Sequence, residues 1–176
     1  MHIIRLSATA LREAEPQLIN VLIDTVANDA SIGFLAPLDE QRARTYFRSL
    51  EASVTEGSRW IWVALIDGLI VGTVQLDLCQ RENGRSRAEI QKLLVLSDCR
   101  RRGIASALME TVEDAARLQH RKLLYLDTET DSPAETFYRE PGYEFVGRIP
   151  DYASSPDGTL HPTSLYYKRL VSEYNR

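Results

Sequence analysis

The sequence has few residues of the kinds that build disulfide frameworks, metal sites or membrane spans. Cys79 and Cys99 are the two cysteines in 176 residues, and their spacing fits neither a CxxC motif nor a metal site. No apolar run approaches the roughly 20 residues of a membrane-spanning helix, and the N-terminus has no signal-peptide pattern. Lysine and arginine (21) do not exceed aspartate and glutamate (25), unlike in a nucleic-acid binder. These absences favour a cytoplasmic protein with free thiols that acts without a membrane, a nucleic acid or a metal.

The common nucleotide-binding signatures are also missing. The chain has no GxxxxGK[ST] segment and no GxGxxG segment, so neither a P-loop nor a dinucleotide fingerprint is present. It has instead a basic turn, Arg100 to Gly103, between two regular segments. The run from Ala88 to Leu96 is short and rich in Leu, Ile and Val, which predicts a buried strand. From Ile104 onward, apolar residues recur at helical spacing.

A strand followed by a basic turn and a helix predicts an anion site. The first backbone N–H groups of a helix have no partner inside the helix, and the helix dipole is positive at that end. Gly103 would let the chain approach a ligand closely, and the preceding arginines add positive charge. The turn is therefore best suited to bind phosphate.

The same turn resembles a family signature. Arg-x-x-Gly-x-Ala, from Arg100 to Ala105, is similar to the Q/R-x-x-G-x-G/A motif of the GNAT N-acetyltransferases. The context agrees with that family: Glu89 lies upstream, a second apolar run follows the helix, and the segment from Ala134 to Tyr138 precedes a Pro-Gly-Tyr turn. The resemblance implies an acetyl-CoA-dependent acyltransferase, and acetyl-CoA is then the expected co-substrate.

The whole chain fits one α/β (α+β) domain, residues 1–176, because no linker or repeat divides it. Hairpin signals such as Asp67-Gly68 predict antiparallel pairs, and the β-α-β pattern in the second half predicts a parallel pair. We expect a mixed, mostly antiparallel sheet with helices on both faces and a central parallel strand pair that splays apart. The rest of the chain predicts helices over 11–29, with Pro16 near the start, and over 39–55. It also predicts strands over 1–7, 142–147 and 164–170, and a polar loop over 151–162.

The resemblance assigns the coenzyme to the central strand and the basic turn. The pantetheine arm would pair with the strand as an added strand, and the pyrophosphate would bind backbone N–H groups at the start of the helix. A backbone N–H near Leu94 would polarise the thioester carbonyl. The expected coenzyme-binding residues are Leu93, Leu94, Val95, Arg100, Arg101, Arg102, Gly103, Ile104, Ala105 and Ser106.

Three residues are candidates for catalysis. Glu89 matches the position of the family's glutamate base, but an ideal strand would place it about 16 Å from Leu94, so a bulge or a water relay would be needed. Asp127, at the end of the next strand, would share the work as base or ammonium anchor. Tyr138 matches the family's tyrosine, whose hydroxyl donates a proton to the leaving thiolate. The alternative roles are a strand-end carboxylate, a loop-capping aspartate and a core tyrosine.

A narrower resemblance is to the tabtoxin-resistance branch of the family. It rests on loop segments, among them Ala30 to Phe34, Leu126 to Glu129 and Pro156 to Gly158. It implies a small-molecule amine as acceptor, such as the toxin's amino acid-like β-lactam. Arg5, Arg87 or His161 could bind a carboxylate of such an acceptor, and an aromatic wall could come from Phe34, Trp60, Tyr152 and Tyr166.

Other functions stay open at this point. A protein or peptide acetyltransferase of the same fold would need an open groove, whereas the apolar loop from Ile32 to Leu38 favours a covered pocket. A non-catalytic acyl-CoA-binding module would not need Glu89 and Tyr138. The family resemblance also leads us to expect a homodimer.

Overall fold

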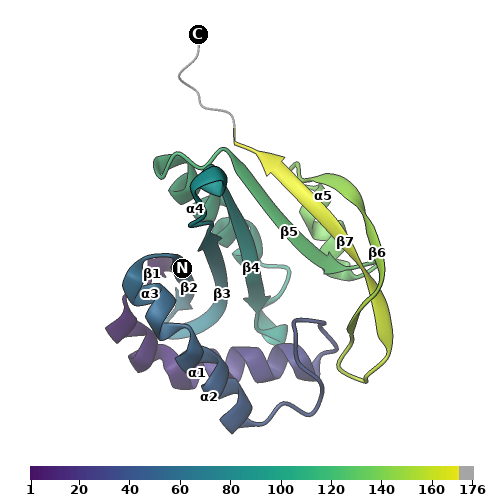
Figure 1. The fold of residues 1–176 in the computed structure, drawn as a ribbon. Helices are drawn as coiled ribbons and strands as arrows, with labels where there is room; N and C mark the ends of the chain where they lie inside the picture. The colour runs from purple at the N-terminus through teal and green to yellow at the C-terminus, as the bar shows by residue number, and fades with distance from the viewer. Residues whose placement is uncertain (171–176) are drawn as a thin grey trace.

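The computed structural model describes residues 1–170, and these residues build one seven-stranded sheet with the strand order β1-β2-β3-β4-β5-β7-β6 (Figure 1). Neighbouring strands run antiparallel except for β4 and β5, which are parallel. The strands are β1 (His2–Arg5), β2 (Arg59–Ile66), β3 (Leu69–Leu78), β4 (Arg87–Val95), β5 (Leu123–Glu129), β6 (Glu144–Ser154) and β7 (Leu160–Arg169). This arrangement confirms the mixed, mostly antiparallel sheet.

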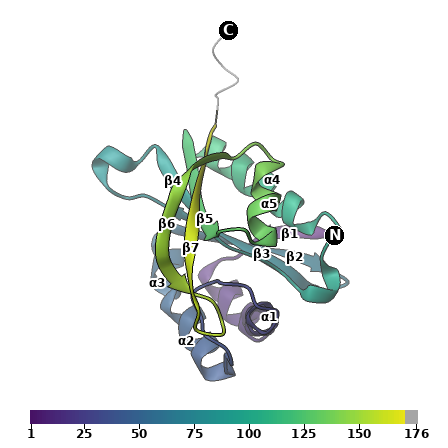
Figure 2. The same ribbon diagram turned by 90° about the vertical axis from the view of Figure 1, so that its right-hand side faces the viewer.

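Helices cover both faces of the sheet, as Figure 2 shows. They are α1 (Ala8–Ala27), α2 (Glu40–Ser49), α3 (Glu51–Glu56), α4 (Ile104–Leu118) and α5 (Pro133–Arg139), with short 3-10 turns η1 (Glu82–Gly84) and η2 (Ser97–Cys99). One core lies between the sheet and α4, where Leu108 and Val112 are fully buried. A second core lies under α1 and α2, around Leu18 and Phe47. No helix of residues 1–170 is long and apolar enough to cross a membrane.

Local signals placed several elements correctly. Asp39 caps α2 by accepting a hydrogen bond from the N–H of Arg42 at 2.8 Å. Asp67 and Gly68 both have positive φ (50° and 80°), which is the conformation of a tight hairpin turn. Cys79 and Cys99 are free, in agreement with the prediction.

Four predicted segments had the wrong bounds or the wrong structure. The helix expected over 39–55 is two helices that meet at Leu50, and Pro16 lies inside α1, which begins earlier because Ser7 caps it. The expected strand over 142–147 is the much longer β6, and most of the expected loop over 151–162 belongs to β6 and β7. Pro150 lies within β6, and an edge strand tolerates proline because its N–H groups can face solvent.

The parallel pair is joined only at one end. Arg87, Ala88 and Glu89 of β4 pair with residues 123–125 of β5, and beyond them the register stops (Figure 1). The remaining part of β4, from Ile90 to Val95, has β3 on one side and an open edge on the other. The expected splay of the central strands is therefore present.

A β-bulge interrupts β4 on its way along this open edge. Gln91 pairs with Gln75 and Leu94 pairs with Thr73, so two residues of β4, Lys92 and Leu93, lie opposite a single residue of β3. Lys92 has a positive φ of 49°. A bulge shortens the path along the strand and changes the direction in which its side chains point. It supplies the irregularity that Glu89 would need to act near Leu94.

Candidate active site

The open edge of β4 is a row of backbone groups that a ligand can pair with. The pairing with β5 ends at Glu89, so the N–H and C=O groups that point away from β3 have no strand partner between Ile90 and Val95. Such an edge accepts an extended chain by β-strand addition. Leu93, Leu94 and Val95, which we predicted to contact the pantetheine arm, all lie on it.

The basic turn has the backbone conformation of an anion site. Arg101 and Gly103 have positive φ values of 60° and 77°, and Gly103 is the N-cap of α4. The first backbone bond of the helix runs from the N–H of Ala107 to the carbonyl of Gly103. The N–H groups of the three residues between them therefore have no partner within the helix. The first turn of α4 contains no acidic side chain that would repel an anion.

Arg101 and Arg102 of this turn form no side-chain hydrogen bond within residues 1–170, whereas the Nε of Arg100 donates to the carbonyl of Val95 at 3.4 Å. Arg100, Arg101 and Arg102 are exposed, and none of them forms an ion pair with a residue of 1–170. Ile104 differs from the other predicted coenzyme residues, because its side chain is 2% exposed and packs in the core under α4. Only the backbone of Ile104 is available to a ligand. Together with the open β4 edge, these donors fit a pantetheine arm that ends in a pyrophosphate.

Asp24 of α1 holds the turn from behind, a contact that the sequence analysis missed. Its carboxylate accepts hydrogen bonds from the N–H and the hydroxyl of Ser97, each 2.8 Å long. Ser97 lies in η2, between the end of β4 and the basic turn. The two residues are 73 positions apart, so no local pattern pointed to this contact.

Glu89 lies where β4 and β5 are about to separate. It pairs with Tyr125 across the two strands, and the Tyr125 hydroxyl donates to its carboxylate at 3.4 Å. The side chain is half-buried and forms no ion pair with a residue of the described chain.

Asp127 lies further along β5, beyond the last residue that pairs with β4. It is exposed, and it accepts a hydrogen bond from the hydroxyl of Thr163 at 2.9 Å. Thr163 is buried on β7 and also donates to the backbone carbonyl of Thr128. The structure thus places Asp127 on the β5 side of the divergence and Glu89 on the β4 side.

Tyr138 is buried on α5, with 8% of its surface exposed. Its ring lies edge-on to Phe137 and Tyr143, at 5.4 and 6.1 Å between ring centres. Burial, and then the negative charge of Asp127, raise the pKa of the Tyr138 hydroxyl well above its usual value. The group therefore stays protonated over the whole working range of pH, as a proton donor must.

Glu135 fixes the helix that carries Tyr138. This carboxylate is 3% exposed and accepts hydrogen bonds from the Asp131 N–H at 2.6 Å and the Tyr166 hydroxyl at 2.7 Å. Arg139 contacts both Glu135 and Tyr166, at 3.2 and 2.9 Å. Burial alone would raise the pKa of Glu135, but these donors lower it to about 2.

A loop and a hairpin tip meet near the diverging ends of β4 and β5, on the side that we call the acceptor side (Figure 1). The N–H of Ala36, between α1 and α2, donates to the carbonyl of Pro156, at the tip of the β6–β7 hairpin, at 2.8 Å. Phe34 of the same loop lies edge-on to Tyr46 of α2, at 5.4 Å between ring centres. Tyr152 of β6 is close enough to Asp127 for that charge to raise the pKa of its hydroxyl.

Two of the four aromatic residues that we expected around the acceptor, Tyr166 and Trp60, lie away from the divergence. Tyr166 is 1% exposed and belongs to the hydrogen-bonded group around Glu135. Trp60 lies under the guanidinium of Arg5, 4.4 Å from its ring centre, beside β1. Phe34 and Tyr152 are the two members that lie around the divergence.

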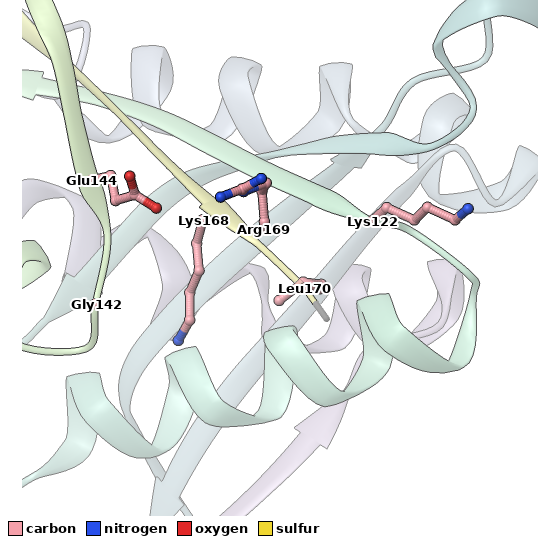
Figure 3. A pocket seen from close by; sticks show the side chains of 6 residues that line it. All are labelled: Lys122, Gly142, Glu144, Lys168, Arg169 and Leu170. Carbon is pink, nitrogen blue, oxygen red and sulfur yellow. The ribbon is translucent and has the colours of Figure 1, made fainter. Parts of the chain in front are cut away.

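A separate hollow of about 530 Å³ lies at the other end of the strand pair (Figure 3). It is lined by Lys122, Gly142, Glu144, Lys168, Arg169 and Leu170. This is the end where β4 and β5 are joined, so the hollow has no open strand edge and does not reach the basic turn. Lys168 is already bound to Glu113 of α4, at 2.7 and 2.9 Å. The candidate site is therefore the divergence and not this hollow.

A split parallel strand pair that leads into a basic, glycine-capped helix start defines an acyl-CoA-dependent transferase fold. The model of the Acetyltransferase (GNAT) family matches residues 23–143, and the chain belongs to this family. It is an acetyl-CoA-dependent acetyltransferase, and the resemblance seen in the sequence is confirmed at this level.

Several solved structures share the fold of this chain. One is the ribosomal-protein-alanine N-acetyltransferase from Brucella melitensis, with 22% identity, a TM-score of 0.79, and coverage of 97% of this chain and 100% of that one. Another is a putative acetyltransferase from Salmonella typhimurium with its cofactor acetyl-CoA, with 13% identity, a TM-score of 0.76, and coverage of 100% and 97%. An N-acetyltransferase from Staphylococcus aureus has 14% identity, a TM-score of 0.78, and coverage of 97% and 100%.

Proposed function

We propose that this enzyme transfers the acetyl group of acetyl-CoA to the amine of a small molecule, such as a toxin or an antibiotic of the tabtoxinine-β-lactam kind. The observation that carries the proposal is the hydrogen bond from Ala36 to Pro156. It joins the α1–α2 loop to the β6–β7 tip, so these two segments together form a roof, that is, a cover over the space in which the acceptor would bind. A peptide chain would need an open groove, whereas a small amine fits beneath such a roof.

Bound acetyl-CoA supplies the acetyl group as a thioester. In our proposal its pyrophosphate is held by the N–H groups of residues 104–106 and by Arg100, Arg101 and Arg102. Leu93, Leu94 and Val95 hold the pantetheine arm by strand pairing, and a backbone N–H near the bulge polarises the thioester carbonyl. The carbonyl carbon is thereby placed at the divergence of β4 and β5.

Glu89, Asp127 and Tyr138 then carry out the proton transfers. Asp127 holds the acceptor ammonium, and Glu89 takes one of its protons, directly or through a water molecule. The free amine nitrogen bonds to the carbonyl carbon and the carbon–sulfur bond breaks. Tyr138 donates its proton to the departing thiolate and regains one from solvent, while the second proton of the acylated nitrogen and the proton on Glu89 pass to solvent. The products are an N-acetyl amide and coenzyme A.

Thiol release measures this reaction directly. Purified protein is incubated with acetyl-CoA and, separately, with small primary amines and with peptides that have a free N-terminal amine. We expect release of coenzyme A with small amines and little with peptides. Faster release with peptides would favour the activity named for the Brucella melitensis enzyme and overturn the small-molecule proposal.

A binding module without activity would respond differently. It would gain thermal stability from acetyl-CoA, because a ligand that binds only the native state stabilises it, but it would release no thiol with any acceptor. The cytoplasmic location and the homodimer expected from the sequence stay predictions.

A further inference from the structure

Lys92 is a half-buried cation without a counter-ion on the acceptor side of the sheet. Its ammonium forms no hydrogen bond or ion pair with a residue of 1–170. Lysines that lie away from water are nearly always paired, because a desolvated charge is costly. Burial lowers the pKa of Lys92, which is the mark of a cation that lacks full compensation.

The bulge in β4 is what places Lys92 there. Gln91 accepts a hydrogen bond from Arg59 on the face of the sheet that α2 covers, so in a regular strand the next residue would point to the α4 face. The extra residue of the bulge brings Lys92 to the same face as Gln91. Its ammonium lies 5.7 Å from the ring centre of Tyr46 and 3.7 Å from the place where a Cβ on Gly33 would be.

The groups around Lys92 come from several segments of the site. The charges of Asp127 and Glu89 act on its pKa, yet neither carboxylate is close enough for an ion pair. Arg59 also acts on it, but Arg59 is already bound to Asp77, Gln75 and Gln91. The acceptor side thus presents two carboxylates and one unpaired ammonium across the same space.

The cations that the sequence offered for an acceptor carboxylate are engaged elsewhere. Arg5 stacks on Trp60 beside β1. Arg87 packs against Gly84 in the η1 turn, where a Cβ would lie 2.6 Å from its guanidinium. His161 lies against the carboxylate of Glu129, at 3.9 Å.

We propose that Lys92 binds a carboxylate of the acetyl acceptor, so that the acceptor is an amine with a carboxylate near its amino group. This inference rests on the proposed small-molecule function and adds the chemical class of the substrate. The acceptor ammonium lies at Asp127 and Glu89, and the acceptor carboxylate lies at Lys92 beneath the loop of Gly33 and Phe34. Each charge of the acceptor then meets a charge of opposite sign.

Matched acceptor pairs test the proposal, with thiol release as the measurement. The pairs are L-lysine and cadaverine, L-threonine and 1-aminopropan-2-ol, and L-phenylalanine and phenethylamine, in which the second member lacks only the carboxylate. We expect the wild-type enzyme to favour the carboxylate-bearing member of at least one pair in kcat/KM by about 10- to 100-fold, the effect of one hydrogen bond to a charged group.

Variants of Lys92 show whether this residue is the cause. Lys92→Met keeps the length of the side chain without its charge, and it should abolish the preference by lowering kcat/KM for the carboxylate-bearing member alone. Lys92→Arg should restore part of it. Lys122→Met, an exposed lysine at the start of β5, is the matched control and should leave the preference unchanged. Thermal unfolding checks that each variant is folded, and Lys92→Gln replaces Lys92→Met if the latter does not fold.

The outcomes separate the two proposals. Release with carboxylate-free amines at equal or higher kcat/KM overturns the role of Lys92 and leaves the small-molecule function standing. No release with any member of any pair overturns the small-molecule function, and the Lys92 inference with it. A preference that survives in both Lys92→Met and Lys92→Gln also overturns the inference, because another group would then bind the carboxylate.

Discussion

The carboxylate of Asp24 accepts two hydrogen bonds from Ser97, one from its N–H and one from its hydroxyl, each 2.8 Å long. Asp24 lies on α1 and Ser97 lies in the η2 turn that precedes the basic turn. The basic turn, which we propose to bind the coenzyme, is thus fixed by a helix on the opposite side of the sheet from α4. A ligand site is tight only when its backbone donors are held in place before the ligand binds.

Asp24→Ala should therefore weaken coenzyme binding, although Asp24 does not contact the coenzyme in our proposal. Loss of hydrogen bonds to a charged group costs roughly 1.5–3 kcal/mol, so we expect the KM for acetyl-CoA to rise about tenfold and the melting temperature to fall. Steady-state kinetics and thermal unfolding measure both effects. Asp98→Ala, an exposed neighbour in η2, is the control. If the KM is the same in both variants, Asp24 does not position the turn.

Gly103→Glu should abolish coenzyme binding in a folded protein. Gly103 has a φ of 77°, which disfavours any side chain, and a carboxylate at the start of α4 would repel a phosphate. Isothermal titration with coenzyme A gives the affinity, and circular dichroism checks the fold. Gly158→Glu, at an exposed hairpin tip with a φ of 89°, carries the same strain and charge away from α4. Unchanged affinity in folded Gly103→Glu would remove the basic turn from the site.

Tyr138→Phe should lower kcat more than it changes the KM for acetyl-CoA. The hydroxyl acts on the leaving thiolate, so its loss is felt in the transition state, by about 10²–10⁴-fold for a general acid. Its raised pKa keeps it protonated, so the wild-type rate should show no fall near pH 10 from this group. Tyr143→Phe, the neighbouring buried tyrosine, is the matched control. Full turnover in Tyr138→Phe would leave this residue with a packing role alone.

The pH dependence of kcat/KM should distinguish the role of Glu89 from that of Asp127. An ammonium must lose a proton before it attacks, so kcat/KM should rise with pH through one ionisation. Glu89→Gln should depress kcat and move this rise to higher pH, whereas Asp127→Asn should chiefly raise the KM for the amine. Glu13→Gln, on the exposed face of α1, is the control. A wild-type profile in both active-site variants would mean that the acceptor loses its proton in bulk water.

Glu135 should make the protein sensitive to acid. Its pKa is lowered to about 2, so its ionised form is bound more strongly in the folded state than in the unfolded chain. The stabilisation it provides is present above the usual glutamate pKa of about 4.3 and is lost as the pH falls towards 2. Chemical unfolding from pH 7 to pH 2.5 should show a steeper loss of stability in the wild type than in Glu135→Gln. Parallel curves would assign the acid sensitivity to other groups.

The sequence predicted the parts of the site that local chemistry determines. Gly103 sits at a positive φ before a helix with a clear apolar stripe, and both features can be read from neighbouring residues. Glu89 and Tyr138 came from the resemblance, and Asp127 came from its position at the end of the next strand. Glu89 and Asp127 lie on either side of the divergence, and the charge of Asp127 acts on the Tyr138 hydroxyl. Their catalytic roles stay predictions.

The parts that were missed depend on distant contacts or on a change of register. Asp24 meets Ser97 across 73 positions, and no pattern links them. The sequence does contain a signal for the bulge at Lys92. Apolar and polar residues alternate from Ala88 to Gln91, and Lys92 breaks the alternation. Such a break is what a bulge produces, because one extra residue shifts every later side chain to the other face. The length of β6 was missed because the residues after Pro150 are polar and precede a Pro-Asp-Gly turn, and only the edge position of the strand explains how it accommodates them.

The hydrogen bond between Ala36 and Pro156 has a consequence for how specificity can evolve in this fold. In our proposal the coenzyme is bound by one continuous stretch of chain, from the edge of β4 to the start of α4, whereas the acceptor is bound by segments that are far apart in sequence. Changes in acceptor choice can accumulate in those segments while the acetyl donor stays the same. Because the α1–α2 loop and the β6–β7 tip are bonded to each other, they form one exchangeable unit. Grafting either segment alone from a relative would leave the other segment without its hydrogen-bond partner.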